Sequence, residues 1–448
     1  MLRIPEDSMH ARNPILNDDI GPFAITPPID CSFESFDRWS GIPTGTVDTA
    51  DAIPSSDVDN ATSSTPMFID PRHLIVLTSP ILHQDLFGKF EPLLRMYDQE
   101  FCITPLSGDI PSNPLRCRLE TCRASRSLLH AILAVSCYHA GRQGSKDDYP
   151  ITDVADHQNT AVELYRKEQN MSYGVQLLDT TIVLFLCRAT QCAFNNWATH
   201  IYEAGKLLKL SGGPGAWLNN RKVQAQVVLL LCIYWSFFDL VGCPRELIVP
   251  LMQLANLAEE NEKALSMRWT RFDLTLVDEI QNSITNWKNS NPDIDEDLSE
   301  EAMHQQRDRW HCTEAWRYGL LIYITRVFRW NRETSVPKKL ATYARFILEH
   351  VQCCRRTSIV QKQAFLPLFF AGCETKDGFS RQSIRDYCQY WDIASGYNLF
   401  SSAASLLEEV WMGQDGLHGD RAWWGSVIDK RQELRSSFGE APMQFCFG

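Results

Sequence analysis

The sequence predicts an all-α fold, a large multi-helix, bundle-like body preceded by a disordered N-terminal tail. From Pro71 onward, apolar residues recur at three- and four-residue steps, which is the spacing of one helix face. Between these runs stand the polar residues, glycines and prolines that typically begin and end helices. Strict two-residue alternation is rare, and no such stretches pair around an Asn-Gly or Asp-Gly turn. With 448 residues, 44% of them hydrophobic, the chain can bury a sizeable core.

Residues 1–70 form the predicted tail, which is acidic and rich in Pro, Ser and Thr. This segment holds three basic and twelve acidic residues, so it carries most of the formal net charge of -12. It also contains eight prolines. Such a composition buries too little apolar area to offset the entropy lost on ordering, so we expect disorder. The negative charge of the whole chain repels phosphate and disfavours stand-alone nucleic-acid binding through overall charge.

One aromatic island interrupts the tail. Phe33, Phe36 and Trp39 alternate there with the acidic residues Glu34 and Asp37. Alternation of acidic and aromatic residues in a disordered segment is typical of an activation segment, or of a partner-binding element that folds on contact. Docking of the island on the chain's own helical body is an equally weighted alternative.

The predicted helical body covers residues 71–440. A helix at about 126–141 is followed by one that begins at Asp179, whose carboxylate is expected to cap the first turn. The next helix, at about 196–210, meets a firm stop, because a Gly-Gly-Pro sequence follows it. An acidic segment at 289–301 is expected to be an internal joint. Further helices are predicted at about 223–241, 249–265, 269–287, 300–330, 337–354, 361–371, 379–396, 399–412 and 421–435.

No secretory signal, transit peptide or membrane anchor is apparent in the sequence. The N-terminal residues lack an apolar stretch of suitable length, and the longest apolar run, 227–238, is too short to cross a bilayer. We therefore expect an intracellular protein without a membrane partner. Most of the fifteen cysteines lie inside apolar runs, which favours reduced core thiols over disulfides.

The sequence lacks recognisable catalytic and metal-binding motifs. The sequence has no nucleophile elbow, phosphate loop, dinucleotide fingerprint or His-Glu-x-x-His zinc motif. His130 and His139 share a helix, but nine steps of about 100° place them on opposite faces, so they cannot hold one metal together. No two cysteines have the Cys-x2-Cys spacing of a zinc module. We therefore predict no catalytic, cofactor or metal site, and no enzymatic activity.

One basic cluster remains, formed by Arg116, Arg118, Arg123 and Arg126. Four arginines in eleven residues can meet phosphate or an acidic partner. The favoured interpretation is the solvated side of an amphipathic helix that pairs locally with Glu120.

Several helical landmarks occur in an order typical of a known family. They are Asn113-Pro114 with the following SLLHAILAVSCYHAG, the apolar helix from Asp179, NNWATHIYEAGKLLKLSGG, LLIYITRVFRWNRE, FLPLFFAGCETKDGFSRQSIRDYCQYW and LLEEVWMGQDG. Over residues 71–435 the chain resembles the fungal-specific transcription factor domain, a helical regulatory domain that usually follows a binuclear zinc cluster. The resemblance implies a nuclear protein that regulates transcription and has no catalytic residues. It also implies partners among other transcription regulators or coactivators, in homo- or heterodimers.

The sequence departs from this family where the zinc cluster is expected. Six cysteines should precede the helical domain, but residues 1–70 contain only Cys31. Two explanations stay open. Either the reading frame begins too late and zinc is bound by a missing upstream module, or the protein reaches DNA through a partner. The alternative function is that of a helical ligand-binding protein or enzyme that shares the fold but does not act in transcription. An effector pocket near the joint at 289–301 is a further hypothesis.

Large landmark side chains also have a purely structural interpretation. Trp391 and Trp411, like Trp197 and Tyr202, are expected to fill contacts between helices. Gly372 and Gly396 are expected to permit close packing or helix ends.

Overall fold

The computed structural model describes fifteen segments of the chain. These are residues 80–106, 109, 113–117, 119–142, 144, 151–171, 176–191, 198–210, 222–223, 226, 242–267, 271–289, 299–331, 334–416 and 422–437. Within them every regular element is a helix and none is a strand, which confirms the predicted all-α class. The predicted tail, residues 1–70, lies outside the described residues.

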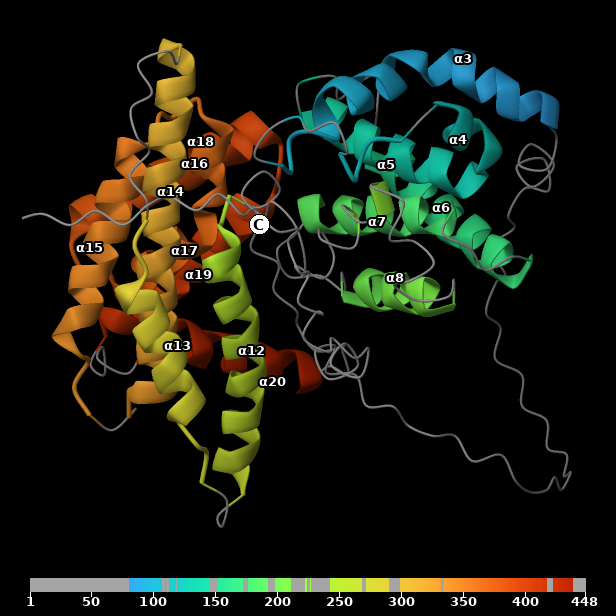
Figure 1. The fold of residues 1–448 in the computed structure, drawn as a ribbon. Coiled ribbons are helices and arrows are strands. Elements are labelled where there is room, and N and C mark those ends of the chain that lie inside the picture. Colours follow the sequence, from blue (N-terminus) through green and yellow to red (C-terminus); the bar gives the residue numbers. More distant parts are fainter. Residues whose placement is uncertain are drawn as a thin grey trace, which may run out of the picture. The chain divides into compact units, whose positions relative to one another are not determined.

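The first group of helices packs around α5 (Figure 1). Its elements are α3 (Pro80–Met96), the π-helical turn η1 (Tyr97–Phe101), α4 (Leu119–Ala124), α5 (Arg126–Arg142), α6 (Ile151–Met171), α7 (Gln176–Gln191) and α8 (Ala198–Leu210). Helix α5 contacts α3, α4, α6 and α7, and α7 in turn contacts α8. Every residue from Ser127 to Cys137 is buried, as expected for a helix that is covered on all sides.

Local sequence explains where α5 begins. Ser125 stands immediately before the helix, and its hydroxyl accepts a hydrogen bond from the backbone N–H of Leu128 at 3.2 Å. This is the bond by which a serine caps a helix start, and such a cap typically contributes about 1 kcal/mol. The expected helix at 126–141 is therefore present at nearly the predicted bounds.

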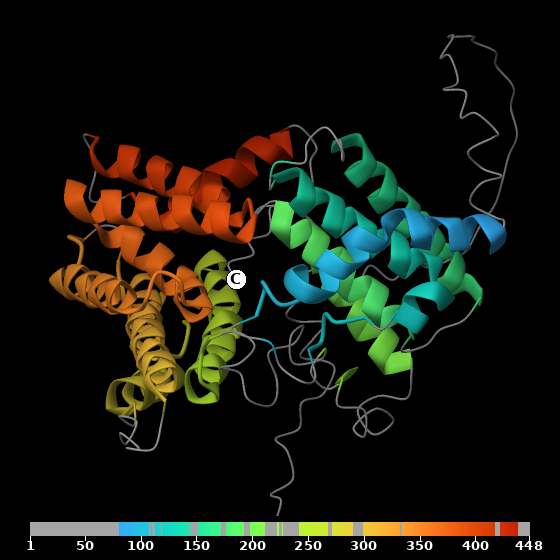
Figure 2. The ribbon, with the colours of Figure 1, turned by 90° about the horizontal axis from the view of Figure 1, so that it is seen from above.

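The second group of helices packs around α14 and α17. Its elements are α12 (Arg245–Ser266), α13 (Thr275–Asn286), α14 (Glu300–Ile324), the π-helical turn η2 (Thr325–Arg329), α15 (Lys338–Cys353), α16 (Ile359–Gln363), α17 (Phe365–Glu374), α18 (Gly378–Ser395), α19 (Leu399–Gln414) and α20 (Trp424–Ser437). Helix α14 contacts α12, α13, α15, α16 and α17. Figure 2 shows α18 and α19 lying side by side.

Gly372, Gly396, Trp391 and Trp411 have the predicted structural roles, whereas Trp197 and the side chain of Tyr202 lie outside the described residues. Gly396 ends α18 in the left-handed conformation, with φ of 70°. A Cβ at Gly372 would come within 2.9 Å of Leu407, so glycine there permits close packing of α17 on α19. Trp391 and Trp411 are buried between helices, and the indole N–H of Trp411 donates to the carbonyl oxygen of Gly372 at 2.8 Å.

Several predicted helix bounds were wrong. Helix α7 begins at Gln176, so Asp179 lies in its first turn and not at the cap position. The helix predicted at 361–371 is two helices, α16 and α17, which meet at Ala364. Helices α3 and α6 are not among the predicted helices. Much of the helix predicted at 223–241 lies outside the described residues.

The proposed joint near 289–301 lies between α13 and α14. These two helices contact each other, and residues 290–298 are outside the described part of the chain. No helix among the described residues is both long and apolar enough to span a bilayer.

Direct bonds connect the two groups of helices. The backbone N–H and side-chain amide of Asn398 donate to the carbonyl oxygens of Thr190 and Gln191, at 2.9 and 3.0 Å. Arg142 donates to the carboxylate of Asp392 at 2.5 Å. These bonds join α7 to the start of α19 and α5 to α18, so the two groups pack as one unit.

Candidate functional site

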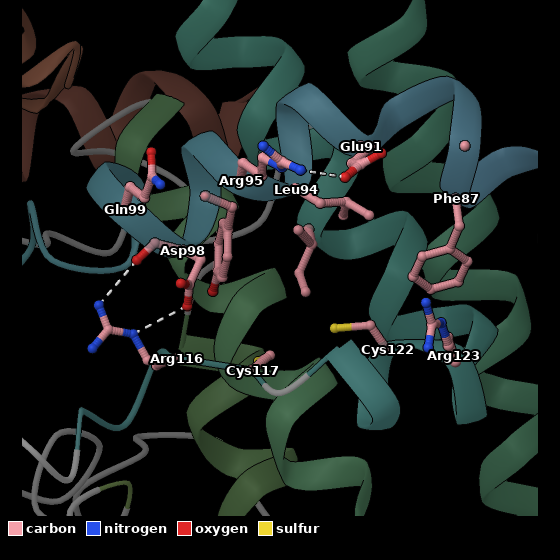
Figure 3. A pocket seen from close by; sticks show the side chains of 13 residues that line it. Phe87, Glu91, Leu94, Arg95, Asp98, Gln99, Arg116, Cys117, Cys122 and Arg123 are labelled. Atoms are coloured by element: carbon pink, nitrogen blue, oxygen red, sulfur yellow. Dashed lines mark hydrogen bonds and ion pairs between the residues drawn. The ribbon is translucent and has the colours of Figure 1, made fainter.

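A cavity of about 700 Å³ opens between α3, η1, α4 and α5 (Figure 3). Its floor is apolar, because Ile132 of α5 and Tyr97 of η1 are almost completely buried. Leu94 and Phe87 of α3 complete the floor and pack against the core of this helix group. They stand seven residues apart, which places them on one helix face.

The segment at residues 113–117 forms one wall of the cavity and is held by buried hydrogen bonds. The amide of Asn113 donates to the carbonyl oxygen of Cys102 at 3.0 Å, and its oxygen accepts from the N–H of Leu115 at 2.9 Å. The hydroxyl of Tyr97 donates to the carbonyl oxygen of Leu115 at 2.8 Å. These bonds explain the landmark at Asn113-Pro114, since the asparagine fixes the chain that carries Arg116 and Cys117.

Charged groups surround the mouth of the cavity. Arg116 donates from Nε to the Asp98 carboxylate at 3.1 Å and from Nη1 to Asp109 at 3.0 Å. Arg95 pairs with Glu91 at 2.6 Å across one turn of α3, and Figure 3 shows this pair on α3, above and apart from Arg116. Such partly exposed pairs orient side chains but contribute little stability, about 1 kcal/mol or less each.

The structure separates the predicted arginine cluster. Arg116 precedes α4, which covers only residues 119–124, so its partners are Asp98 and Asp109 and not Glu120. Arg123 lies on α4 over the ring of Phe87, with 5.6 Å between its guanidinium carbon and the ring centre. Arg126 begins α5, and Arg118 lies outside the described residues. The predicted single amphipathic helix was therefore wrong, although Arg116 and Arg123 both line the cavity.

Two thiols also line this cavity, those of Cys117 and Cys122. Burial raises the pKa of the Cys122 thiol to about 12 and raises the pKa of the Cys117 thiol well above its ordinary value. Both therefore stay protonated at neutral pH, and a protonated thiol is a poor nucleophile and metal ligand. The cavity offers apolar surface and guanidinium groups, which suit the binding of an amphipathic ligand better than catalysis.

His130 and His139, which the sequence places on opposite faces of one helix, have different neighbours in the structure. Nδ1 of His130 is 2.9 Å from Nδ1 of His157 on α6. His139 stacks on Phe101 at 4.5 Å between ring centres, and burial lowers the pKa of its imidazole to about 3. His139 is therefore neutral at physiological pH. A second pair, His311 and His350, was not foreseen, because these residues are 39 positions apart in the sequence.

Among the described residues, no three His, Cys, Asp or Glu side chains are grouped to hold a metal ion. None of the eleven cysteines that the structure describes is joined in a disulfide bond. The proposed partner-binding residues Phe33, Phe36 and Trp39 lie outside the described residues, so their role stays a prediction.

Fold and site together describe a helical domain suited to binding. Comparison with protein families then identifies it, because the family described as the fungal specific transcription factor domain matches residues 92–238 and 234–438. The chain belongs to this family, which confirms the resemblance seen in the sequence. The family is a transcription factor domain, a class generally without enzymatic activity. No curated protein and no solved structure matches the chain.

Proposed function

We propose that the protein is a fungal transcriptional regulator that acts in the nucleus, and that its helical domain serves regulation and protein association. The family match, which extends over most of the chain, carries this proposal. DNA is contacted through a partner, or through a six-cysteine zinc module on a longer form of the chain. The net charge of -12 supports DNA contact through a partner or a separate module, because the chain as a whole repels the phosphate backbone.

We assign association with coactivators to the aromatic island of the tail. Aromatic side chains supply large apolar contacts, and the neighbouring carboxylates keep the free segment soluble and guide it toward a basic partner. Phe33, Phe36 and Trp39 are the residues expected to bury themselves in the partner. Docking of the island on the helical body is the competing arrangement.

A tethering experiment tests this role. The chain, fused to a foreign DNA-binding domain, is expected to change the output of a reporter gene. The triple variant Phe33→Ala, Phe36→Ala, Trp39→Ala should lose most of that effect. The matched control replaces Ile15, Leu16 and Phe23 by alanine, which removes apolar side chains from the same tail outside the island. Equal output from both variants would reject the island as the activating element, and an inert parent fusion would reject the activation role.

A fluorescent fusion of the chain tests the location. Accumulation in the nucleus, measured by microscopy against a nuclear marker, is the expected result. Exclusion from the nucleus under every growth condition tested would contradict the proposal.

The cavity between α3, α4 and α5 favours a second candidate function, a helical ligand-binding protein outside transcription. Its volume of about 700 Å³ is within the range of small-molecule sites. A reporter that does not respond to the tethered chain, together with a metabolite that raises its melting temperature, would favour this alternative.

A further inference from the structure

A second cavity, of about 500 Å³, lies where α15 begins and α17 ends. Its walls come from η2, α15, the segment between α17 and α18, and residues near the end of α19. The charged side chains of its lining are Arg326, Lys338, Arg345 and Lys376 against Glu374 and Asp377. Four positive and two negative groups line the cavity, and one of the four, Arg345, pairs with Glu349 outside the lining at 3.4 Å, so the excess is about one positive charge. The site is therefore basic within a protein that is acidic as a whole.

The deepest of these charges is Arg326, which is only 3% exposed. Its Nε and Nη2 donate to the two carboxylate oxygens of Glu374, each at 2.6 Å. Its guanidinium carbon stands 4.3 Å from the ring centre of Trp330. The third nitrogen, Nη1, is buried and has no hydrogen-bond partner among the described residues. A buried guanidinium N–H without an acceptor is unfavourable, and it commonly marks the place of a water or an anion.

The start of α15 points to the same kind of occupant. Its cap position is Pro337, which offers no side-chain acceptor, and its first turn contains no acidic residue. Lys338 and Lys339 occupy that turn instead. Because the N-terminus of a helix already carries partial positive charge, each lysine there is unfavourable by about 0.3–1 kcal/mol. An anion would offset this repulsion and accept from the N–H groups that have no intrahelical acceptor.

We propose that this cavity binds a small organic anion, whose phosphate or carboxylate oxygens accept from Nη1 of Arg326 and from the first turn of α15. The two acidic groups of the lining already have partners. Glu374 is held by Arg326, and Asp377 caps α18 by accepting from the N–H of Ser380 at 2.8 Å. The Arg326–Glu374 pair is close to neutral as a whole, so the attraction for an anion comes from Lys338, the helix N-terminus and the remaining N–H groups of Arg326 Nη1.

The other side chains that line the cavity indicate the chemistry of the rest of the ligand. Val336, Pro337, Ala341, Ala344 and Leu348 give an apolar wall beside the basic groups. The cavity is larger than inorganic phosphate requires, so it has room for an apolar body attached to the anionic head. The structure thus fits a compact aromatic or aliphatic phosphomonoester or carboxylic acid.

Three probes distinguish the possible head groups on the full-length chain. Inorganic phosphate tests the head alone, phenyl phosphate adds an apolar body, and benzoate replaces phosphate by carboxylate. Binding is measured by calorimetry and by the rise in melting temperature at constant ionic strength. Stabilisation by phenyl phosphate alone supports a phosphomonoester site, and stabilisation by benzoate alone supports a carboxylate site. If neither organic probe binds, the proposal is overturned.

Matched variants localise the binding. Lys338→Gln removes a charge that lines the cavity and should weaken binding about tenfold, as expected for one charge-assisted contact. Lys339→Gln removes the same charge from the same turn outside the lining and should change affinity far less. If both variants weaken the affinity for the probe equally, the effect is due to the charge at the helix end in general, and the proposed site is overturned.

A double substitution tests Arg326 without leaving a buried charge unpaired. Arg326→Met together with Glu374→Met replaces the ion pair by apolar side chains of similar size, a change that buried pairs often tolerate. The double variant should fold, as judged by circular dichroism, and should lose binding of the organic probe. Unchanged binding in the folded double variant would contradict the proposal. No transcription assay is involved, so this outcome is independent of the proposed function.

Discussion

Lys362→Met is expected to stabilise the protein. Lys362 lies in the short helix α16 and is only 6% exposed. Its ammonium group donates to the carbonyl oxygen of Leu106 at 3.5 Å, a long hydrogen bond that compensates little of the lost hydration. Burial alone lowers the pKa of this lysine from its ordinary value of 10.5 to about 7. A methionine of similar length fills the same space without a charge.

The pKa difference gives the size of the effect. A lysine pKa of about 7 in the folded state and 10.5 in the unfolded state corresponds to about 5 kcal/mol, at about 1.4 kcal/mol for each tenfold change. Between these two values the unfolded chain binds a proton that the folded chain does not. Stability therefore falls as the pH is lowered from 10.5 toward 7, and below pH 7 the full cost is present. Structural relaxation and water entry make about 5 kcal/mol an upper figure.

Urea unfolding at about pH 6 and about pH 10, followed by circular dichroism, measures the effect. Lys362→Met should raise the free energy of unfolding by several kcal/mol at the lower pH and much less at the higher pH. The control, Lys288→Met, removes an exposed lysine and should stay within about 0.5 kcal/mol of the parent at both. A variant no more stable than the parent at the lower pH, or with an equal gain at both, would refute this account of Lys362.

Three further substitutions test the fold and the first cavity by urea unfolding. Gly396→Ala should cost about 1–3 kcal/mol, because φ there is 70° and a Cβ would lie 2.8 Å from Nδ1 of His139. Asp308→Asn should cost about 1–3 kcal/mol, because this fully buried carboxylate accepts from Nε of Arg355 at 2.7 Å and from its backbone N–H at 3.0 Å. Arg116→Gln should cost about 1 kcal/mol or less, and its effect should shrink at high salt, since its carboxylate partners are exposed. A loss of several kcal/mol for Arg116→Gln, or none for the other two, would contradict these assignments.

Helix periodicity made much of the fold predictable. The run at 126–141 was assigned correctly because its apolar residues and its start signal are local features. Helix α6 was not assigned individually, since its buried positions, such as Val154, Ala161 and Tyr165, stand among many polar residues. The prediction of Asp179 as a cap was wrong, because an acidic residue is also favourable inside the first turn of a helix.

The sites were less predictable than the fold. Arg116 and Arg123 were noticed as basic residues, but the sequence contains no sign that they line a cavity opposite Phe87 and Leu94. The bond between Arg116 and Asp98 spans 18 positions. Asn113 was noticed as a landmark, and its role in holding the wall of the cavity became visible only from its bond to the carbonyl oxygen of Cys102.

The sequence by itself determined the helical class, many of the helices and the family, because periodicity, start signals and motif order are read over a few residues at a time. Only the tertiary structure decided which distant side chains meet. Arg326 and Glu374 are 48 positions apart, and Lys362 reaches a carbonyl 256 positions away. Such pairs depend on how whole helices pack, and packing is set by the shape and burial of many side chains at once. Cavities and perturbed pKa values follow from that packing, so they are properties of the folded molecule.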